Sequence, residues 1–161
     1  MPVLKRPRRL IALTGIAFVL IVAAPTAHLL LRPRQTRHVA VPAPDATPEQ
    51  VVTAFVDALN AHDCQTAEAL MTTGSKTEAR AWCEDVASLM DVDVRDHLTE
   101  DPQATGHSSA EEVANVPVTF NLNWRPFHND GSMDPGATRW GYLLVRDSAH
   151  APWRIFDQGV G

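Results

Sequence analysis

The chain has 161 residues with 12 Pro, 8 Gly and 2 Cys, which is room for one ordinary domain. Its 45% hydrophobic content excludes wholesale disorder, and two cysteines exclude a disulfide-dense mini-scaffold. Residues 1–37 carry seven Lys or Arg and no acidic residue, whereas residues 38–161 carry seven basic and 19 acidic side chains. The acidic part lacks the basic face that binding phosphates requires, which excludes a nucleic-acid partner.

Residues 10–31, LIALTGIAFVLIVAAPTAHLLL, contain no charged side chain. About 20 helical residues cross a hydrocarbon core of roughly 30 Å, so we predict a transmembrane anchor here. The basic tail, residues 1–9, is then cytoplasmic, and the acidic domain lies outside the cell. A cleaved signal peptide is the alternative, but Pro25 directly follows the small-residue site Val22-Ala23-Ala24 and disfavours cleavage.

Residues 32–46, RPRQTRHVAVPAPDA, contain three prolines and no apolar periodicity. Proline fixes φ and removes an amide donor, so the segment is expected to be an extended, solvated spacer. The globular domain then covers residues 47–161.

Three helices are expected to open this domain. Thr47-Pro48-Glu49-Gln50 is a helix start with a capping box, and it precedes apolar residues at helical spacing that end near His62. Asp63 caps a short second helix, which Gly74 ends. Ser75-x-x-Glu78 predicts the start of a third helix, with one side formed by Ala79, Trp82, Val86, Leu89 and Met90.

After Asp91 the apolar period changes from 3.6 to 2, which predicts strands. Half-buried strands are expected at residues 92–98 and 116–125, a central strand at 140–145 and a last strand at 153–158. Polar or turn-rich segments separate them at 101–109, 126–137 and 148–152. Helices followed by about four antiparallel strands indicate an α+β layer packing.

The two cysteines, Cys64 and Cys83, fall on the second and third expected helices. Outside the membrane, thiols meet an oxidising environment and an even count favours pairing. We therefore predict a structural disulfide. The alternative, a metal or nucleophile site at His62-Asp63-Cys64, lacks a Cys-x-x-Cys pair and zinc-like His spacing, so no metal is expected.

Thr47 to Met71, with the corner Asn60-Ala61-His62-Asp63, resembles the first helix pair of the nuclear transport factor 2-like superfamily. The end of the chain, with Trp153-Arg154-Ile155, resembles that family's closing hairpin. The resemblance implies a cone: a bent antiparallel sheet wrapped over the first helix, with a pocket in its mouth. The superfamily includes isomerases, dehydratases and cyclases, binding modules without catalysis, and membrane-anchored scaffolds of secretion and conjugation machines, so the fold leaves the function open.

Enzymes of that superfamily place Asp, His, Tyr or Arg in the pocket. The resemblance therefore implies Asp157, Tyr142, His128 and Arg146 as weak catalytic candidates, although they form no fixed-spacing motif. Asp157 shares the expected strand face of Trp153 and is either a buried general base or a solvated strand-end residue. The aromatic side chains that either line a ligand pocket or fill the core are Trp82, Phe120, Trp124, Trp140, Tyr142 and Trp153.

The leading functional hypothesis is a membrane-anchored, extracytoplasmic binding domain without catalysis, whose pocket takes a small apolar ligand or an envelope protein. One alternative is an enzyme of the isomerase, dehydratase or cyclase kind. The other is a structural subunit of a secretion or conjugation complex, which predicts a homo-oligomer. The expected partner in every case is the lipid bilayer, and no cofactor is expected.

Overall fold

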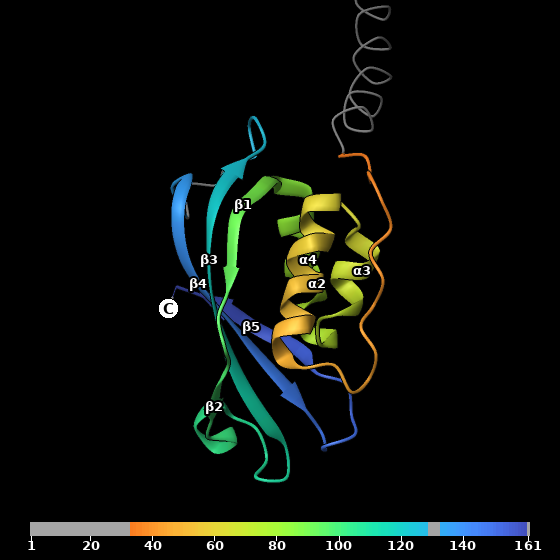
Figure 1. The fold of residues 1–161 in the computed structure, drawn as a ribbon, viewed down its shortest axis with the longest axis vertical. Helices are drawn as coiled ribbons and strands as arrows, with labels where there is room; N and C mark the ends of the chain where they lie inside the picture. Colours follow the sequence, from red (N-terminus) through yellow and green to blue (C-terminus); the bar gives the residue numbers. More distant parts are fainter. Residues whose placement is uncertain (1–32, 129–132, 161) are drawn as a thin grey trace, which may run out of the picture. The chain divides into compact units, whose positions relative to one another are not determined.

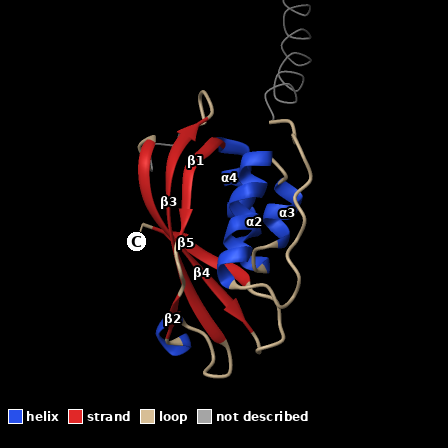
Figure 2. Ribbon diagram, in the orientation of Figure 1, coloured by secondary structure: helices blue, strands red, loops and turns tan. Residues whose placement is uncertain are grey.

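The computed structural model describes residues 33–128 and 133–160, and residues 34–161 form one compact unit. Its α+β architecture confirms the predicted class (Figures 1 and 2). The elements in chain order are α2 (Pro48–Ala61), α3 (Cys64–Ala69), α4 (Lys76–Asp85), β1 (Val86–Val94), β2 (Leu98–Glu100), β3 (Glu112–Trp124), β4 (Gly136–Arg146) and β5 (Arg154–Gly159), with short 3-10 helices at Thr73–Ser75 and Pro102–Thr105.

The predicted anchor, residues 10–31, lies outside the described residues. In the part of the chain that the structure describes, no helix has the length and apolar character needed to cross a membrane.

Helix α2 is the central helix of the domain, and its start and end agree with the sequence. The Thr47 hydroxyl accepts from the Gln50 amide, the Gln50 side chain accepts from the Thr47 amide, and His62 ends the helix in the left-handed region at φ 51°. The apolar face predicted from the sequence is buried in full and consists of Val51, Val52, Phe55, Val56 and Leu59. It packs on the sheet, so the domain has one core between helices and strands.

The disulfide between Cys64 and Cys83 is present and confirms the predicted pairing. It joins the first residue of α3 to α4 across a sequence separation of 19 residues. Because α3 has only six residues, this bond gives the helix pair a covalent constraint in addition to its small apolar interface.

The third helix is shorter than predicted, because α4 ends at Asp85 and Val86 begins strand β1. The register against β3 shifts between Val86 and Ser88, so one extra residue lies in β1. This bulge puts Val86 and Leu89 on the same buried face three residues apart, which is a helical spacing. The prediction of a helix through Met90 was wrong for this reason.

The start of α4 also differs from the predicted capping box. The Ser75 side chain caps no helix amide, and its hydroxyl donates instead to the Phe156 carbonyl at 2.6 Å. Ser75 therefore ties the start of α4 to the last strand.

The five strands form one antiparallel sheet. Four of them lie in the order β1-β3-β4-β5, and β2 pairs with the first part of β3, along the same edge of β3 that pairs with β1 in its later part. Pro117 of β3, which has no amide hydrogen, lies between the part paired with β2 and the part paired with β1. Its carbonyl accepts from the Arg95 amide at 2.9 Å. The residue of β3 that has no amide donor therefore lies between its pairing with β2 and its pairing with β1.

The predicted half-burial of the first strand region holds only in part. Val94 packs against the core, but Val92 is 37% exposed and Leu98 is 58% exposed. A second register shift, between Met90 and Asp93, breaks the alternation that predicted burial of all three.

The Pro-rich segment is not a wholly solvated spacer, because residues 36–39 lie along the helices. Val39 is buried, the Thr36 amide donates to the Ala61 carbonyl at 2.8 Å, and the Thr66 hydroxyl donates to the Val39 carbonyl at 3.0 Å. We call residues 36–39 the strap. No pattern in residues 36–39 predicts the strap, since it is held by backbone groups and by polar side chains of other elements.

Candidate functional site

In the described part of the chain, hollows border several of the side chains that the sequence singled out. The first, which we call the tryptophan hollow, has a volume of about 430 Å³ and is bordered by α4, β3, β4 and the end of β5. Its described lining consists of Glu78, Ala81, Trp82, Asp85, Trp124, His128, Met133, Trp140, Gln158 and Val160. Three of the six predicted pocket aromatics, Trp82, Trp124 and Trp140, therefore meet here.

Trp82 of α4 stands between the other two indoles. Its ring centroid lies 5.7 Å from that of Trp124 on β3 and 5.3 Å from that of Trp140 on β4, with interplanar angles of 51° and 48°. Tilted rings cannot cover one another fully, and Trp82 and Trp124 remain half-buried. Part of their surface is thus available to a ligand in the hollow.

Polar side chains form two pairs at the border of this hollow. The Gln158 amide donates to the Glu78 carboxylate at 2.9 Å, and Trp140 Nε1 donates to Gln158 Oε1 at 3.5 Å. The His128 Nδ1 and Asp85 Oδ1 atoms are 2.7 Å apart. Trp124 Nε1 donates to the Met133 carbonyl at 3.0 Å, which fixes the position of that indole. The aromatic wall is thus held in place by hydrogen bonds at its edges.

The other predicted site residues lie elsewhere. Tyr142 is fully buried against Phe55, with ring centroids 5.5 Å apart, and burial raises the pKa of its hydroxyl. Its hydroxyl has no hydrogen-bond partner in the described part of the chain. Phe120 is largely buried in the sheet and borders a separate hollow of about 330 Å³, and Trp153 borders a further hollow beside the start of α2. These three side chains do not line the tryptophan hollow.

Asp157 is exposed, which agrees with the interpretation of a solvated strand-end residue and contradicts the alternative of a buried general base. The cause is a bulge: Leu143 pairs with Asp157 and the next residue, Leu144, pairs with Ile155, which leaves Phe156 as an extra residue. The bulge reverses the alternation after Ile155. Gln158, opposite Tyr142, takes the inward position instead and borders the tryptophan hollow.

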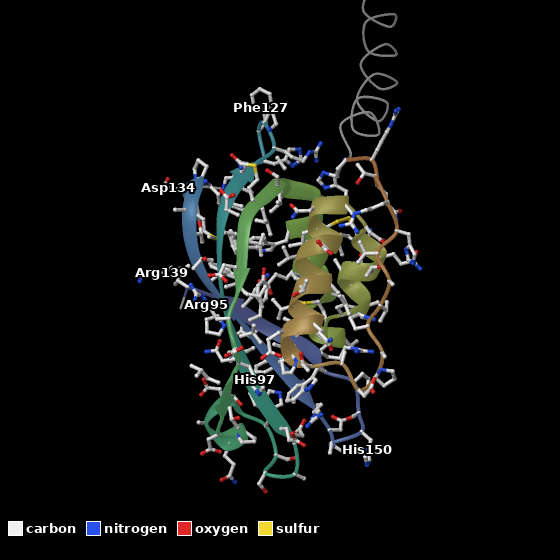
Figure 3. The ribbon with its side chains drawn as sticks, viewed as in Figure 1. Arg95, His97, Phe127, Asp134, Arg139 and His150 are labelled. Atoms are coloured by element: carbon white, nitrogen blue, oxygen red, sulfur yellow. A yellow bond between two sulfur atoms is a disulfide. The ribbon has the colours of Figure 1, made fainter. Side chains whose placement is uncertain are left out.

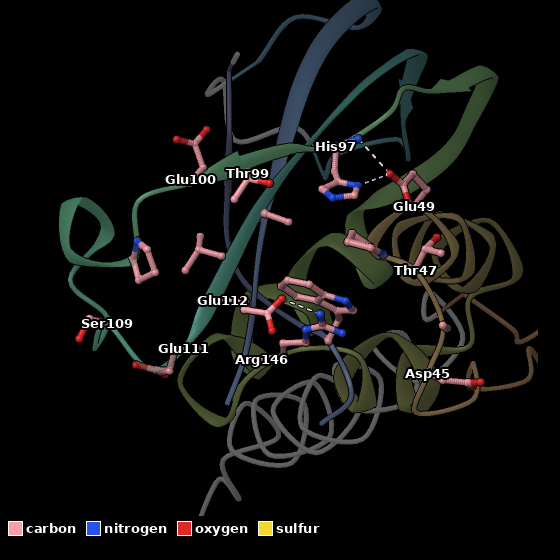
Figure 4. A pocket seen from close by; sticks show the side chains of 16 residues that line it. Asp45, Thr47, Glu49, His97, Thr99, Glu100, Ser109, Glu111, Glu112 and Arg146 are labelled. Atoms are coloured by element: carbon pink, nitrogen blue, oxygen red, sulfur yellow. Dashed lines mark hydrogen bonds and ion pairs between the residues drawn. The ribbon is translucent and has the colours of Figure 1, made fainter. Parts of the chain in front are cut away.

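The second hollow, of about 520 Å³, lies beside the start of α2, β2 and the adjoining ends of β3 and β4 (Figure 4). We call it the acidic hollow, because its lining includes Asp45, Glu49, Glu100, Glu111 and Glu112. The Arg146 guanidinium lies 4.5 Å from the Trp153 ring centroid and pairs with Glu112 at 2.5 Å. Its other terminal nitrogen donates to the Ala149 carbonyl at 3.2 Å, so Arg146, a catalytic candidate from the sequence, has three partners in its own chain.

Glu49 and His97 form a second pair in the acidic hollow. Glu49 Oε1 accepts from the His97 amide at 2.9 Å and lies 2.6 Å from His97 Nδ1 (Figure 4). Partial burial alone would raise the pKa of this carboxyl, but hydrogen bonds from Thr47 and His97 outweigh it and lower the pKa from 4.5 to about 2. The ionised form is therefore favoured in the folded chain.

The bonds between Glu49 and His97 should make part of the free energy of unfolding depend on pH in the acidic range. Because the folded-state pKa is depressed, the contribution is complete above pH 4.5 and is lost as the pH falls toward 2. Glu49→Gln should therefore lower the free energy of unfolding by about 1 kcal/mol at neutral pH, since the pair is partly exposed. Denaturant titrations at several pH values check this: the difference between the two proteins should vanish near pH 2, and a pH-independent difference would contradict it.

Sequence reasoning missed Glu78, Asp85 and Gln158 as pocket residues. Glu78, Trp82 and Asp85 are spaced i, i+4 and i+7, which places them on one face of α4, and that spacing was the available signal. The capping-box interpretation assigned Glu78 to the helix start instead. Among the described residues, no three His, Cys, Asp or Glu side chains are grouped so that they could hold a metal ion.

The described geometry defines an α+β domain with one aromatic and one acidic hollow. A family model described as Domain of unknown function (DUF4829) matches residues 49–159, and the chain belongs to this family. No curated protein and no solved structure matches the chain.

Proposed function

We propose that this protein is a non-catalytic binding domain, anchored in the membrane and facing the exterior, whose tryptophan hollow takes a small, largely apolar ligand. The observation that carries the proposal is the meeting of Trp82, Trp124 and Trp140 from three elements around one hollow. Its volume of about 430 Å³ lies in the range of small-molecule sites, which are mostly apolar with a few polar groups.

The proposed location has two supports. Residues 10–31 have the length and apolar character of a membrane anchor preceded by a basic tail. The Cys64–Cys83 disulfide fits an oxidising exterior, because cytosolic reductants keep most thiols reduced.

We also propose membership of the nuclear transport factor 2-like superfamily. The support is the chain order: a capped central helix, a short second helix after an Asn-x-x-Asp corner, and then an antiparallel sheet whose inner face packs on the helices (Figure 1). A cone of that kind has a pocket in its mouth, and the tryptophan hollow between α4 and the sheet is the proposed counterpart of that pocket.

Removing the central indole tests the binding proposal. Trp82→Ala should lower the affinity for any ligand of this hollow at least tenfold, since it deletes a large apolar contact. The full chain, extracted from its own membranes, is analysed by native mass spectrometry for a co-purifying molecule, and that molecule is titrated by tryptophan fluorescence. Phe127→Ala is the control, because Phe127 is fully exposed at the β3–β4 connection, outside the lining (Figure 3). Equal loss in both variants would contradict the proposal.

A second candidate function is supported by the Asp85–His128 pair. A carboxylate 2.7 Å from one imidazole nitrogen orients the ring, and the other nitrogen can then accept or donate a proton in the hollow. That arrangement suits an isomerase or dehydratase. Recovery of the bound molecule chemically unchanged after prolonged incubation supports binding, whereas its conversion to an isomer or dehydrated product supports catalysis.

A further inference from the structure

The tryptophan hollow combines an aromatic wall with acidic side chains, and this combination narrows the class of ligand. We infer that it binds an organic cation, a quaternary or protonated amine on an apolar body. This inference rests on the proposed function and specifies its ligand.

The indole rings that line the hollow favour a cationic ligand. The faces of aromatic rings carry negative electrostatic potential, and indole attracts cations more strongly than the other aromatic side chains do. Two indoles, those of Trp124 and Trp140, lie beside Trp82 at ring-centroid distances of 5.7 and 5.3 Å, with interplanar angles of 51° and 48°. A compact cation in the hollow can therefore contact more than one π-face.

The acidic side chains of the lining also favour a cationic ligand. Glu78 and Asp85 border the hollow from the same face of α4, and none of the described lining residues is Lys or Arg. Glu78 is bonded to the neutral amide of Gln158, so its charge has no cationic partner in that bond. An anion in the hollow would be repelled, whereas a cation gains electrostatic attraction in addition to apolar contact.

An organic cation suits this site better than a metal ion. A metal ion needs several oxygen or nitrogen ligands that converge on one point, and the described residues offer no such group of three. A quaternary amine needs no directed ligand bonds, because its charge is spread over apolar groups and is attracted by ring faces and nearby carboxylates.

The acidic hollow provides an internal comparison. There the Arg146 guanidinium lies over the face of Trp153 and is neutralised by Glu112. The protein thus already contains one aromatic face that holds a cation beside a carboxylate. In the tryptophan hollow the described lining contains the ring faces and two carboxylates but no arginine or lysine. Asp85 is paired with His128, whereas Glu78 is bonded to the neutral amide of Gln158, so the position of the cation beside Glu78 is left for a ligand.

The experiment compares three probes of nearly equal shape and different charge: choline, its neutral carbon analogue 3,3-dimethylbutan-1-ol, and the anion 3,3-dimethylbutanoate. Each is titrated into the full chain in non-ionic detergent, with tryptophan fluorescence and calorimetry as readouts. We expect choline to bind at least tenfold more tightly than the alcohol, and the anion to bind most weakly.

Two substitutions test whether the preference for choline over the alcohol depends on the Glu78 and Asp85 carboxylates. Glu78→Gln and Asp85→Asn should each lower the choline affinity about threefold to tenfold and leave the affinity for the alcohol unchanged. Asp57→Asn is the matched control, because Asp57 is an exposed carboxylate of α2 outside the lining. Trp82→Phe, which keeps an aromatic ring, should lower the choline affinity less than Trp82→Leu does, and thermal melts establish that each variant is folded.

The outcomes distinguish a failure of the cation inference from a failure of the proposed binding function. Equal affinity for choline and the alcohol, or a preference unaffected by both carboxylate variants, would overturn the cation inference and leave an apolar binding site. If none of the three probes binds and no molecule co-purifies with the chain, the proposed function fails as well.

Discussion

Replacing both Cys64 and Cys83 with alanine is expected to lower the free energy of unfolding by about 3 kcal/mol. The disulfide closes a loop with a sequence separation of 19 residues, and in the chain-entropy model this restricts the unfolded ensemble by about that amount. The melting temperature should fall by roughly 10 °C for a domain of this size. The effect is large because α3 is short and the bond is its covalent link to α4.

Urea denaturation of the full chain in non-ionic detergent, with and without a reductant, measures this effect. The unmodified chain in reductant should resemble the double variant, and the reductant should leave the double variant unchanged. A second test uses intact cells, in which Cys64 and Cys83 should resist alkylation until the chain is denatured and reduced. An unfolding midpoint that does not respond to the double substitution would contradict the prediction.

Asp63→Ala is expected to cost about 3 kcal/mol of stability, because this side chain serves three structural connections at once. Asp63 is 1% exposed and its carboxylate accepts from the amides of Val39 and Thr66. It also lies 2.9 Å from His38 Nδ1. Loss of a helix N-cap costs about 1 kcal/mol, and each buried donor left without its charged acceptor costs a similar amount or more.

Thermal and urea unfolding of Asp63→Ala, Asp63→Asn and Asp57→Ala provide the test. Asp57 makes an exposed ion pair with Arg37 at 3.4 Å, so its loss should change stability by less than about 0.5 kcal/mol. Asp63→Asn keeps one acceptor oxygen and should fall between the other two. Equal stability of the two alanine variants would show that the strap is not held through Asp63.

The contribution of Asp63 to the free energy of unfolding should decrease as the pH falls. Burial alone would raise its pKa, but the hydrogen bonds from Val39, Thr66 and His38 outweigh burial and hold the pKa below its ordinary value of 3.8. Its contribution is therefore present above pH 3.8 and is lost on further acidification. The difference in stability between the unmodified chain and Asp63→Asn should shrink in that acidic range.

The helical half of the domain could be predicted because its signals are local. Thr47 with Gln50 and Asp63 with Thr66 satisfy helix amides a few residues away, and the apolar face of α2 repeats at 3.6 residues. The cysteine pairing followed from the count and the expected compartment. None of these inferences required knowledge of distant contacts.

The errors within the sheet have a common physical cause, which is the β-bulge. The bulge in β1 mimics helical spacing at Val86 and Leu89, and the bulge at Phe156 moves Asp157 to the exposed side. A bulge is set by pairing with a strand far along the chain, so a period-2 pattern cannot reveal it. The same limit explains why Gln158 was missed as a border residue of the tryptophan hollow.

The interrupted ladder along β3 also bears on self-association. On that side the bulged β1 presents Asp91 and Asp93 to solvent, and Arg95, which follows the strand, is exposed as well. At the opposite margin, Leu70, Thr72 and Ser75 form hydrogen bonds with backbone groups of Ile155 and Phe156. Charges, bulges and covered backbone all hinder strand-to-strand addition between molecules. Copies of this protein at high local concentration are thereby hindered from joining their sheets into fibres, and a specific assembly would have to use side-chain surfaces.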